Sequence, residues 1–199
     1  MKLLVLGASQ GTGALAVERA LAHGHEVTAF ARSPQKLTLE HPKLHKLAGD
    51  FHNDASVTAA IAGHDAVIIT ASATKLAAFK DEPQYFSKGT AFAIAGMKRH
   101  GVKRLVVLSA NGTGDSRQLL PWIARKLMLD WLLKIPYADH EVQERQVRES
   151  GLDWVIARPG RLTDGPALGK YVVFPAPPNR HNPVKPAATA ISRQAQRAA

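Results

Sequence analysis

The residues with the clearest chemical potential are the glycines of "GASQGTG", which follow the apolar run "KLLVL". A glycine-rich turn between a buried strand and a helix leaves backbone N–H groups and the positive end of the helix dipole available to an anion. This strand–turn–helix context predicts a pyrophosphate site, and a tight turn that merely needs glycines is the less favoured alternative. The residues expected to contact a dinucleotide here are Gly7, Ser9, Gln10, Gly11, Thr12 and Gly13.

The end of the second expected strand bears on which dinucleotide is bound. An NAD site usually places Asp or Glu about 20 residues beyond the glycines, where it binds the ribose 2′-hydroxyl. Between Glu26 and Glu40 this chain has no acidic residue, and Arg32, Ser33 and Lys36 stand there instead. A guanidinium at this place can pair with a 2′-phosphate. The sequence therefore predicts NADP(H) in preference to NAD(H).

Apolar runs and helical patterns alternate along the first 160 residues. Strands are expected at 2–7, 25–32, 43–50, 65–70, 102–110 and 152–160. Helices are expected at 12–23, 54–63 (capped by Asp54 or Ser56), 83–100, 118–134 and 138–150, the last two separated by Ile135-Pro136. Sustained alternation of this kind predicts an α/β fold: a Rossmann-type doubly wound parallel sheet of about six to seven strands with helices on both faces.

The 199 residues are expected to form one domain, 1–199, whose last part differs in composition. Six of the twelve prolines lie between Pro166 and Pro186, and no acidic residue follows Asp164. Residues 165–199 are therefore a Pro-rich basic segment. Within it "GKYVVFP" could be a short strand, and "AATAISRQAQRAA" could be a helix or a frayed tail.

Composition excludes several classes of function. The net charge of +10 does not favour nucleic acid as a partner, because half of the excess lies in the basic segment and no nucleic-acid-binding motif is present. Zero cysteines exclude disulfides and thiolate metal sites, and no metal site is expected. No apolar run is long enough to span a membrane, and Met1-Lys2 leads straight into a strand. We expect a cytoplasmic protein with no membrane partner, as a monomer or weak homodimer.

Several longer stretches carry a family resemblance. On "GASQGTG", "GHEVTAFARSPQKL", "MKRHGVKRLVVLSA" and "ADHEVQERQVRESGLDWVIARPG", the chain resembles the atypical short-chain dehydrogenases/reductases of the NmrA-like, NAD(P)H-binding group. It is similar to the flavin and biliverdin reductases of that group over about Lys2 to Tyr171. The family usually has GAxGxTG, and Gln10 stands where its second glycine would be. The resemblance implies further cofactor contacts at Asp50, Phe51, Ala71, Ser72, Ser109, His140, Pro159, Gly160, Arg161 and Leu162.

The Tyr-x-x-x-Lys pair of short-chain enzymes is absent. His140 takes the Lys position, Pro136 takes the Tyr position, and Tyr137 lies one residue away. The resemblance leaves Ser109 and His140 as the candidate catalytic residues. Ser109 could bind the acceptor or only cap a turn. His140 could supply a proton, but the chain has nine histidines, and one of them is no signal of catalysis by itself. Residues 111–121 are expected to form a lid on the substrate side.

These features predict an NADPH-dependent oxidoreductase. Without a dedicated acid, the acceptor would be a planar molecule ready to take hydride, namely a flavin, a quinone or a linear tetrapyrrole. FMN or FAD would then enter as a substrate rather than as a prosthetic group. The alternative is a non-catalytic NADP(H) sensor of the NmrA-like type, whose partner is another protein.

Overall fold

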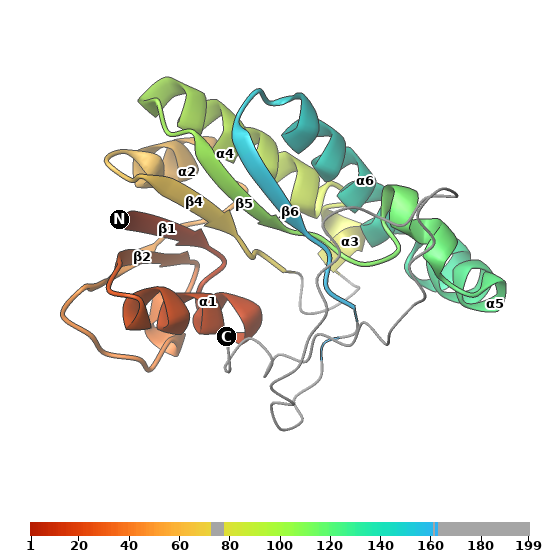
Figure 1. Cartoon of the computed structure of the whole chain (residues 1–199), viewed down its shortest axis with the longest axis horizontal. Coiled ribbons are helices and arrows are strands. Elements are labelled where there is room, and N and C mark those ends of the chain that lie inside the picture. The colour runs from red at the N-terminus through yellow and green to blue at the C-terminus, as the bar shows by residue number, and fades with distance from the viewer. Residues whose placement is uncertain (73–77, 161, 163–199) are drawn as a thin grey trace.

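A computed structural model describes residues 1–72, 78–160 and 162. Its six parallel strands are β1 (Lys2–Leu6), β2 (Glu26–Ala31), β3 (Leu44–Ala48), β4 (Ala66–Ile69), β5 (Arg104–Leu108) and β6 (Asp153–Ala157). They form one sheet in the order β3-β2-β1-β4-β5-β6, as Figure 1 shows. The predicted doubly wound Rossmann fold is confirmed. The order reverses between β1 and β4, where open α/β sheets bind ligands at the carboxyl ends of the strands.

The main helices divide between the two faces of the sheet. Helix α1 (Gly11–Ala22) packs against β1 and β2, whereas α4 (Tyr85–His100) lies between α2 (Asp54–Ile61) and α6 (Lys134–Glu149) on the other face. Short elements complete the described chain: η1 (Pro34–Lys36), α3 (Ala78–Asp81), η2 (Gly114–Leu119), α5 (Trp122–Ala124) and the π-helical η3 (Arg125–Leu132).

The alternation of side chains along β1 divides the core into two layers. Leu4 and Leu6 join a cluster with residues of α2 and α4, such as Ile61 and Met97. Leu3 and Val5 point to the other face and pack with side chains of α1 and β2. A strand buried on both faces requires a continuous apolar run, which explains the sequence "LLVL".

Two expectations about helix boundaries are wrong. Ile135-Pro136 does not separate two helices, because Pro136 is the third residue of α6. N–H groups in the first turn have no intrahelical partner, so proline removes no helical hydrogen bond there. The cap of α2 is Asn53, whose side chain accepts the Ser56 N–H at 2.8 Å, and not Asp54 or Ser56.

The expected helix over 118–134 is also wrong as a single element. It is interrupted at Leu120-Pro121, where both residues have extended backbone angles. Helix α5 starts after Pro121 and continues as the π-helical η3. The expected strand "GKYVVFP" and the rest of the 165–199 segment lie outside the described residues.

The N-terminus of α4 is capped from another helix. Asp139 of α6 is buried, and its carboxylate accepts the N–H of Phe86 at 2.6 Å and that of Ser87 at 3.2 Å. A carboxylate at this end satisfies first-turn donors and faces the positive end of the helix dipole. The contact fixes the first turn of α4, including Tyr85, against α6.

Candidate cofactor pocket

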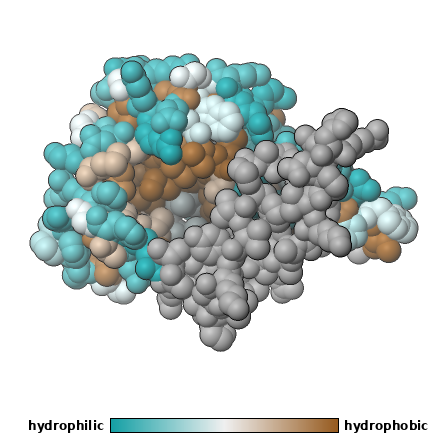
Figure 2. Space-filling view, viewed as in Figure 1, coloured by the Kyte–Doolittle hydropathy of each residue, from teal (hydrophilic) through white to brown (hydrophobic). Residues whose placement is uncertain are grey.

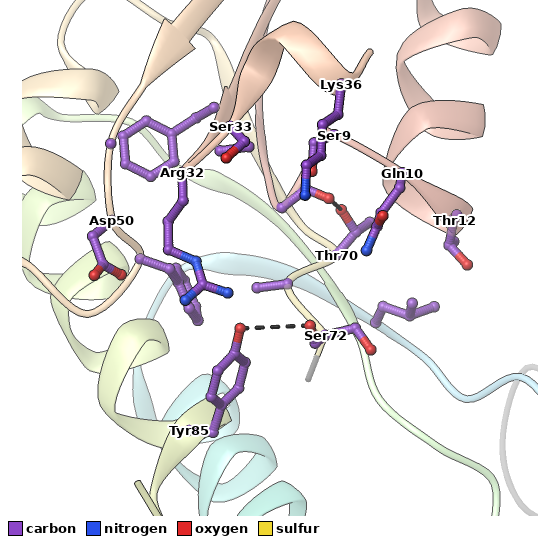
Figure 3. Close-up of a pocket in the computed structure, with 18 of the residues that line it drawn as sticks. Ser9, Gln10, Thr12, Arg32, Ser33, Lys36, Asp50, Thr70, Ser72 and Tyr85 are labelled. Atoms are coloured by element: carbon purple, nitrogen blue, oxygen red, sulfur yellow. Dashed lines mark hydrogen bonds between the residues drawn. The ribbon is translucent and has the colours of Figure 1, made fainter. Parts of the chain in front are cut away.

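A pocket of about 290 Å³ opens at the carboxyl ends of β1, β2 and β4. Figure 3 shows its side chains converging from the glycine-rich turn, the end of β2 and the start of α4. Thirteen of the predicted cofactor residues line it: Gly7, Ser9, Gln10, Gly11, Thr12, Arg32, Ser33, Lys36, Asp50, Phe51, Ala71, Ser72 and Leu162. The structure thus brings together in one place residues from five separate segments of the chain.

Two glycines set the shape of the turn. Gly7 has a φ of +92°, and a Cβ there would lie 2.5 Å from the backbone N and Cα of Ala71. At Gly13 a Cβ would lie 2.1 Å from the Gly7 carbonyl oxygen. Glycine at position 7 allows the turn to lie this close to the end of β4, and glycine at position 13 allows α1 to lie this close to the turn. Gly13 therefore does not line the pocket itself but holds the helix that does.

The N-terminus of α1 has the properties of an anion site. The N-cap residue is Gln10, whose side chain makes no capping hydrogen bond, and the first turn carries no acidic side chain. Gln10, Gly11 and Thr12 at this helix end all line the pocket. First-turn N–H groups and the helix dipole therefore face the cavity, as a pyrophosphate requires.

The opposite side of the pocket carries two cations and one carboxylate. Arg32 follows β2 directly, and Figure 3 shows its guanidinium extending into the cavity toward Tyr85. Lys36 lines the cavity from η1. The Asp50 carboxylate accepts the N–H of His52 at 2.9 Å. The basic side chains thus stand beyond β2, where the sequence predicts a 2′-phosphate.

The pocket also has lining residues that the sequence did not predict: Phe30, Ala31, Gly49, Thr70, Tyr85 and Leu108. Tyr85 is the polar one with the largest side chain. Its hydroxyl is 3.5 Å from the Ser72 carbonyl oxygen, and burial raises the pKa of its phenol, with Arg32 acting against the rise and Asp50 adding to it. No sequence signal marks Tyr85, because the Asp139 cap that places it comes from a distant helix.

The Ser109 side chain is buried in the protein interior. Its hydroxyl donates to Glu144 Oε1 at 2.7 Å, and Arg158 Nε donates to the same oxygen at 2.7 Å. Burial raises the pKa of Glu144, but hydrogen bonds from Arg158 and Ser109 hold it below its usual value. Arg158 also pairs with Asp115 at 2.5 Å. Ser109 thus helps to satisfy a buried ion pair and does not line the described pocket.

His140 lies in the contact between α4 and α6. Its ring stacks on Phe86 with centroids 3.9 Å apart, and its Nδ1 is 2.9 Å from Gln143 Oε1. Burial lowers the pKa of His140, while the hydrogen bond to Gln143 acts against this. His140 does not line the described pocket, so a catalytic role for it or for Ser109 stays a prediction.

The remaining sequence-predicted residues fall beside the pocket. The buried Pro159 accepts the N–H of Asn111 at 3.0 Å through its carbonyl, and neither it nor Gly160 is among the lining residues. Arg161 lies outside the described residues. The Tyr137 hydroxyl donates to the Asn111 carbonyl at 3.0 Å, and burial raises its pKa. The loop after β5 is therefore tied to both β6 and α6.

The described residues contain neither a candidate metal site nor a candidate membrane span. No group of three or more His, Asp or Glu side chains in these ranges could hold a metal ion. No helix within them is long and apolar enough to cross a membrane.

Comparisons with known proteins agree with this geometry. A family model described as NAD(P)H-binding matches residues 7–195. A 3-beta-hydroxysteroid dehydrogenase from Mycolicibacterium neoaurum is 35% identical over 118 residues, which cover 55% of this chain and 32% of that protein. The chain spans less than two thirds of the length of the curated relatives that it matches.

Several solved structures match over 98% of this chain, among them the following two. ChuY, an anaerobilin reductase from Escherichia coli O157:H7, is 23% identical with a TM-score of 0.74 over 86% of its own chain. A short-chain dehydrogenase/reductase from Veillonella parvula in complex with NADP is 18% identical with a TM-score of 0.75 over 82% of its chain. At these identities the likeness shows the fold. Because the family model spans nearly the whole sequence, this chain belongs to the NAD(P)H-binding family of Rossmann-fold proteins.

Proposed function

We propose that this chain is an NADPH-dependent reductase whose acceptor is a planar molecule such as a flavin, a quinone or a linear tetrapyrrole. The observation that carries the proposal is the pairing of two binding regions in one pocket: the α1 N-terminus on one side, and Arg32 and Lys36 on the other. The first fits a pyrophosphate and the second fits a 2′-phosphate. When bound, NADPH supplies a hydride from its nicotinamide ring.

The choice of acceptor rests on the expected absence of a dedicated proton donor. By the family resemblance, Pro136 and His140 stand at the positions of the Tyr-x-x-x-Lys pair, and the described pocket includes neither Ser109 nor His140. A carbonyl substrate needs a positioned acid, whereas a flavin, quinone or tetrapyrrole accepts hydride with less help. The reductase fold of ChuY and the NADP-bound relative from Veillonella parvula support the reaction class and the cofactor by analogy.

The proposal is tested by steady-state oxidation of NADPH with FMN, FAD, a naphthoquinone and biliverdin. Turnover of at least one acceptor, with NADPH preferred to NADH, is expected. Tight NADPH binding without turnover of any acceptor would favour the NADP(H) sensor instead. In that case the partner would be another protein.

The cofactor preference gives the first prediction. Arg32→Ala should weaken NADPH binding by about one to two decades and NADH binding far less, because only NADPH carries the phosphate. Fluorescence titration of both cofactors measures this. Arg99→Ala removes the same charge from an exposed site on α4 and should leave both affinities unchanged. Equal losses of NADPH and NADH affinity in Arg32→Ala would contradict the NADP assignment.

The second prediction concerns the two candidate catalytic residues. Because neither Ser109 nor His140 lines the described pocket, Ser109→Ala and His140→Ala should each lower kcat by no more than about one to two decades, less than the ~10²–10⁴ lost with a dedicated proton donor. Both side chains are packed in the interior, so thermal unfolding and NADPH affinity must be measured beside kcat. A larger loss of kcat with unchanged folding and binding would identify a true acid.

The third prediction distinguishes a displaced acid from a loop contact. Tyr137→Phe removes the hydroxyl that donates to Asn111 and should lower stability by about 0.5–1.5 kcal/mol while kcat changes little. Urea unfolding and steady-state kinetics report the two effects separately. Abolished turnover in a variant that still binds NADPH would make Tyr137 the proton donor and return carbonyl substrates to consideration.

A further inference from the structure

The segment Trp122–Ile135 carries five of the exposed large apolar side chains of the described residues, and the others are Met1, Leu47, Trp154 and Val155. Trp122 is 66% exposed and Trp131 is 77% exposed, and Ile123, Leu132 and Ile135 are also open to solvent. This segment spans α5, η3 and the start of α6, and it projects at the right-hand end of the molecule in Figure 1. Figure 2 shows hydrophobic side chains on the same projection. Exposed apolar side chains that gather in one place often mark an interaction site, whereas single scattered ones do not.

Basic residues accompany the tryptophans. The segment contains Arg125, Lys126 and Lys134 against a single acid, Asp130, which gives it a formal charge of +2. Lys126 and Lys134 are exposed, and the whole chain carries +10. A partner that suits both exposed indole rings and exposed lysines must offer an amphipathic interface and negative charge at the same place.

We propose that the segment Trp122–Ile135 docks this chain peripherally onto an anionic lipid surface. Indole rings settle at the headgroup level of a bilayer, and each lysine or arginine near the surface is attracted to anionic headgroups. A second copy of the chain is a poorer partner, because a two-fold contact would set this +2 segment against itself. The proposal departs from the sequence expectation of no membrane partner, which rested on the absence of a spanning helix.

The segment lies on the functional side of the sheet. It follows the loop after β5, and all six strands are parallel, so it leaves the sheet at the same carboxyl edge at which the cofactor pocket opens. Docking through it would hold that edge near the lipid. The docking does not depend on the proposed reaction, and each can fail without the other.

Co-sedimentation with phosphatidylcholine vesicles, with and without phosphatidylglycerol, tests the proposal. The chain should bind only the anionic vesicles. Arg125→Gln/Lys126→Gln should weaken binding by about tenfold or more. Lys98→Gln/Arg99→Gln removes the same charge from exposed residues of α4 and should have a small effect. All variants should keep their NADPH affinity, which confirms that they fold.

Tryptophan emission gives a second readout. Binding should shift the emission to shorter wavelength, and Trp122→Phe/Trp131→Phe should remove the shift, because the remaining Trp154 lies on β6, outside the docking segment. Trp122→Ala/Trp131→Ala should abolish vesicle binding. If Arg125→Gln/Lys126→Gln and Lys98→Gln/Arg99→Gln lose equal vesicle affinity, net charge alone explains the binding and the proposal is overturned. It would equally be overturned by absent vesicle binding, or by a dimer that the alanine variant dissociates while vesicle binding persists.

Discussion

Gly7→Ala should abolish NADPH binding and lower the free energy of unfolding by more than about 4 kcal/mol, a size reached by few single substitutions. A Cβ at Gly7 would lie 2.5 Å from the backbone of Ala71, and the three nearest atoms all belong to the backbone rather than to a side chain that can rotate away. The turn or β4 must move. Either movement displaces the N-terminus of α1, on which the pyrophosphate site depends.

Gly63→Ala is the matched control. Gly63 has a φ of +75°, close to that of Gly7, but nothing lies within 4 Å of a Cβ there. It should lose only the roughly 1–2 kcal/mol of a left-handed alanine and bind NADPH as before. Urea unfolding with and without NADPH measures both quantities, since bound cofactor stabilises only a fold that binds it. If Gly7→Ala and Gly63→Ala lose the same stability and bind NADPH equally well, the turn does not lie as close to β4 as the structure shows.

The cofactor pocket was largely predictable because its signals are local. Gly7 and Gly11 sit in a strand–turn–helix unit, and Arg32 follows the next strand, so sheet topology alone brings them to one edge. Tyr85 was not predictable in this way. It enters the pocket because Asp139, more than 50 residues later, caps the helix that begins with it.

The predicted boundaries of α6 were wrong for a related reason. Pro136 signals a break in any local pattern, yet the first turn of a helix tolerates it, and only the structure shows that α6 begins at Lys134. Ser109 and His140 were placed in the cofactor pocket by family resemblance. Their partners, Glu144 and Phe86, are set by how α6 packs against β5 and α4, which no spacing in the sequence reveals.

The packing of α6 also yields the second large effect. Glu144→Ala should lower the free energy of unfolding by about 3–5 kcal/mol, because it leaves the guanidinium of Arg158 without its buried partner. Glu144 is 3% exposed and receives hydrogen bonds from Ser109, Arg158 and Arg148. Glu141→Ala, on an exposed position of the same helix, should change stability by no more than about 0.5 kcal/mol.

The pH dependence of this stability separates the ion pair from simple packing. The pKa of Glu144 is lower in the folded chain than its usual 4.5, so its contribution is complete above that value and is lost as pH falls through the folded pKa. The free energy of unfolding of the native chain, measured in urea, should therefore fall more steeply on acidification than that of Glu144→Gln, which has no carboxylate to protonate. Parallel pH profiles for the two proteins would show that Glu144 acts through shape alone. Ser109 would then owe its position to packing and not to the charge it contacts.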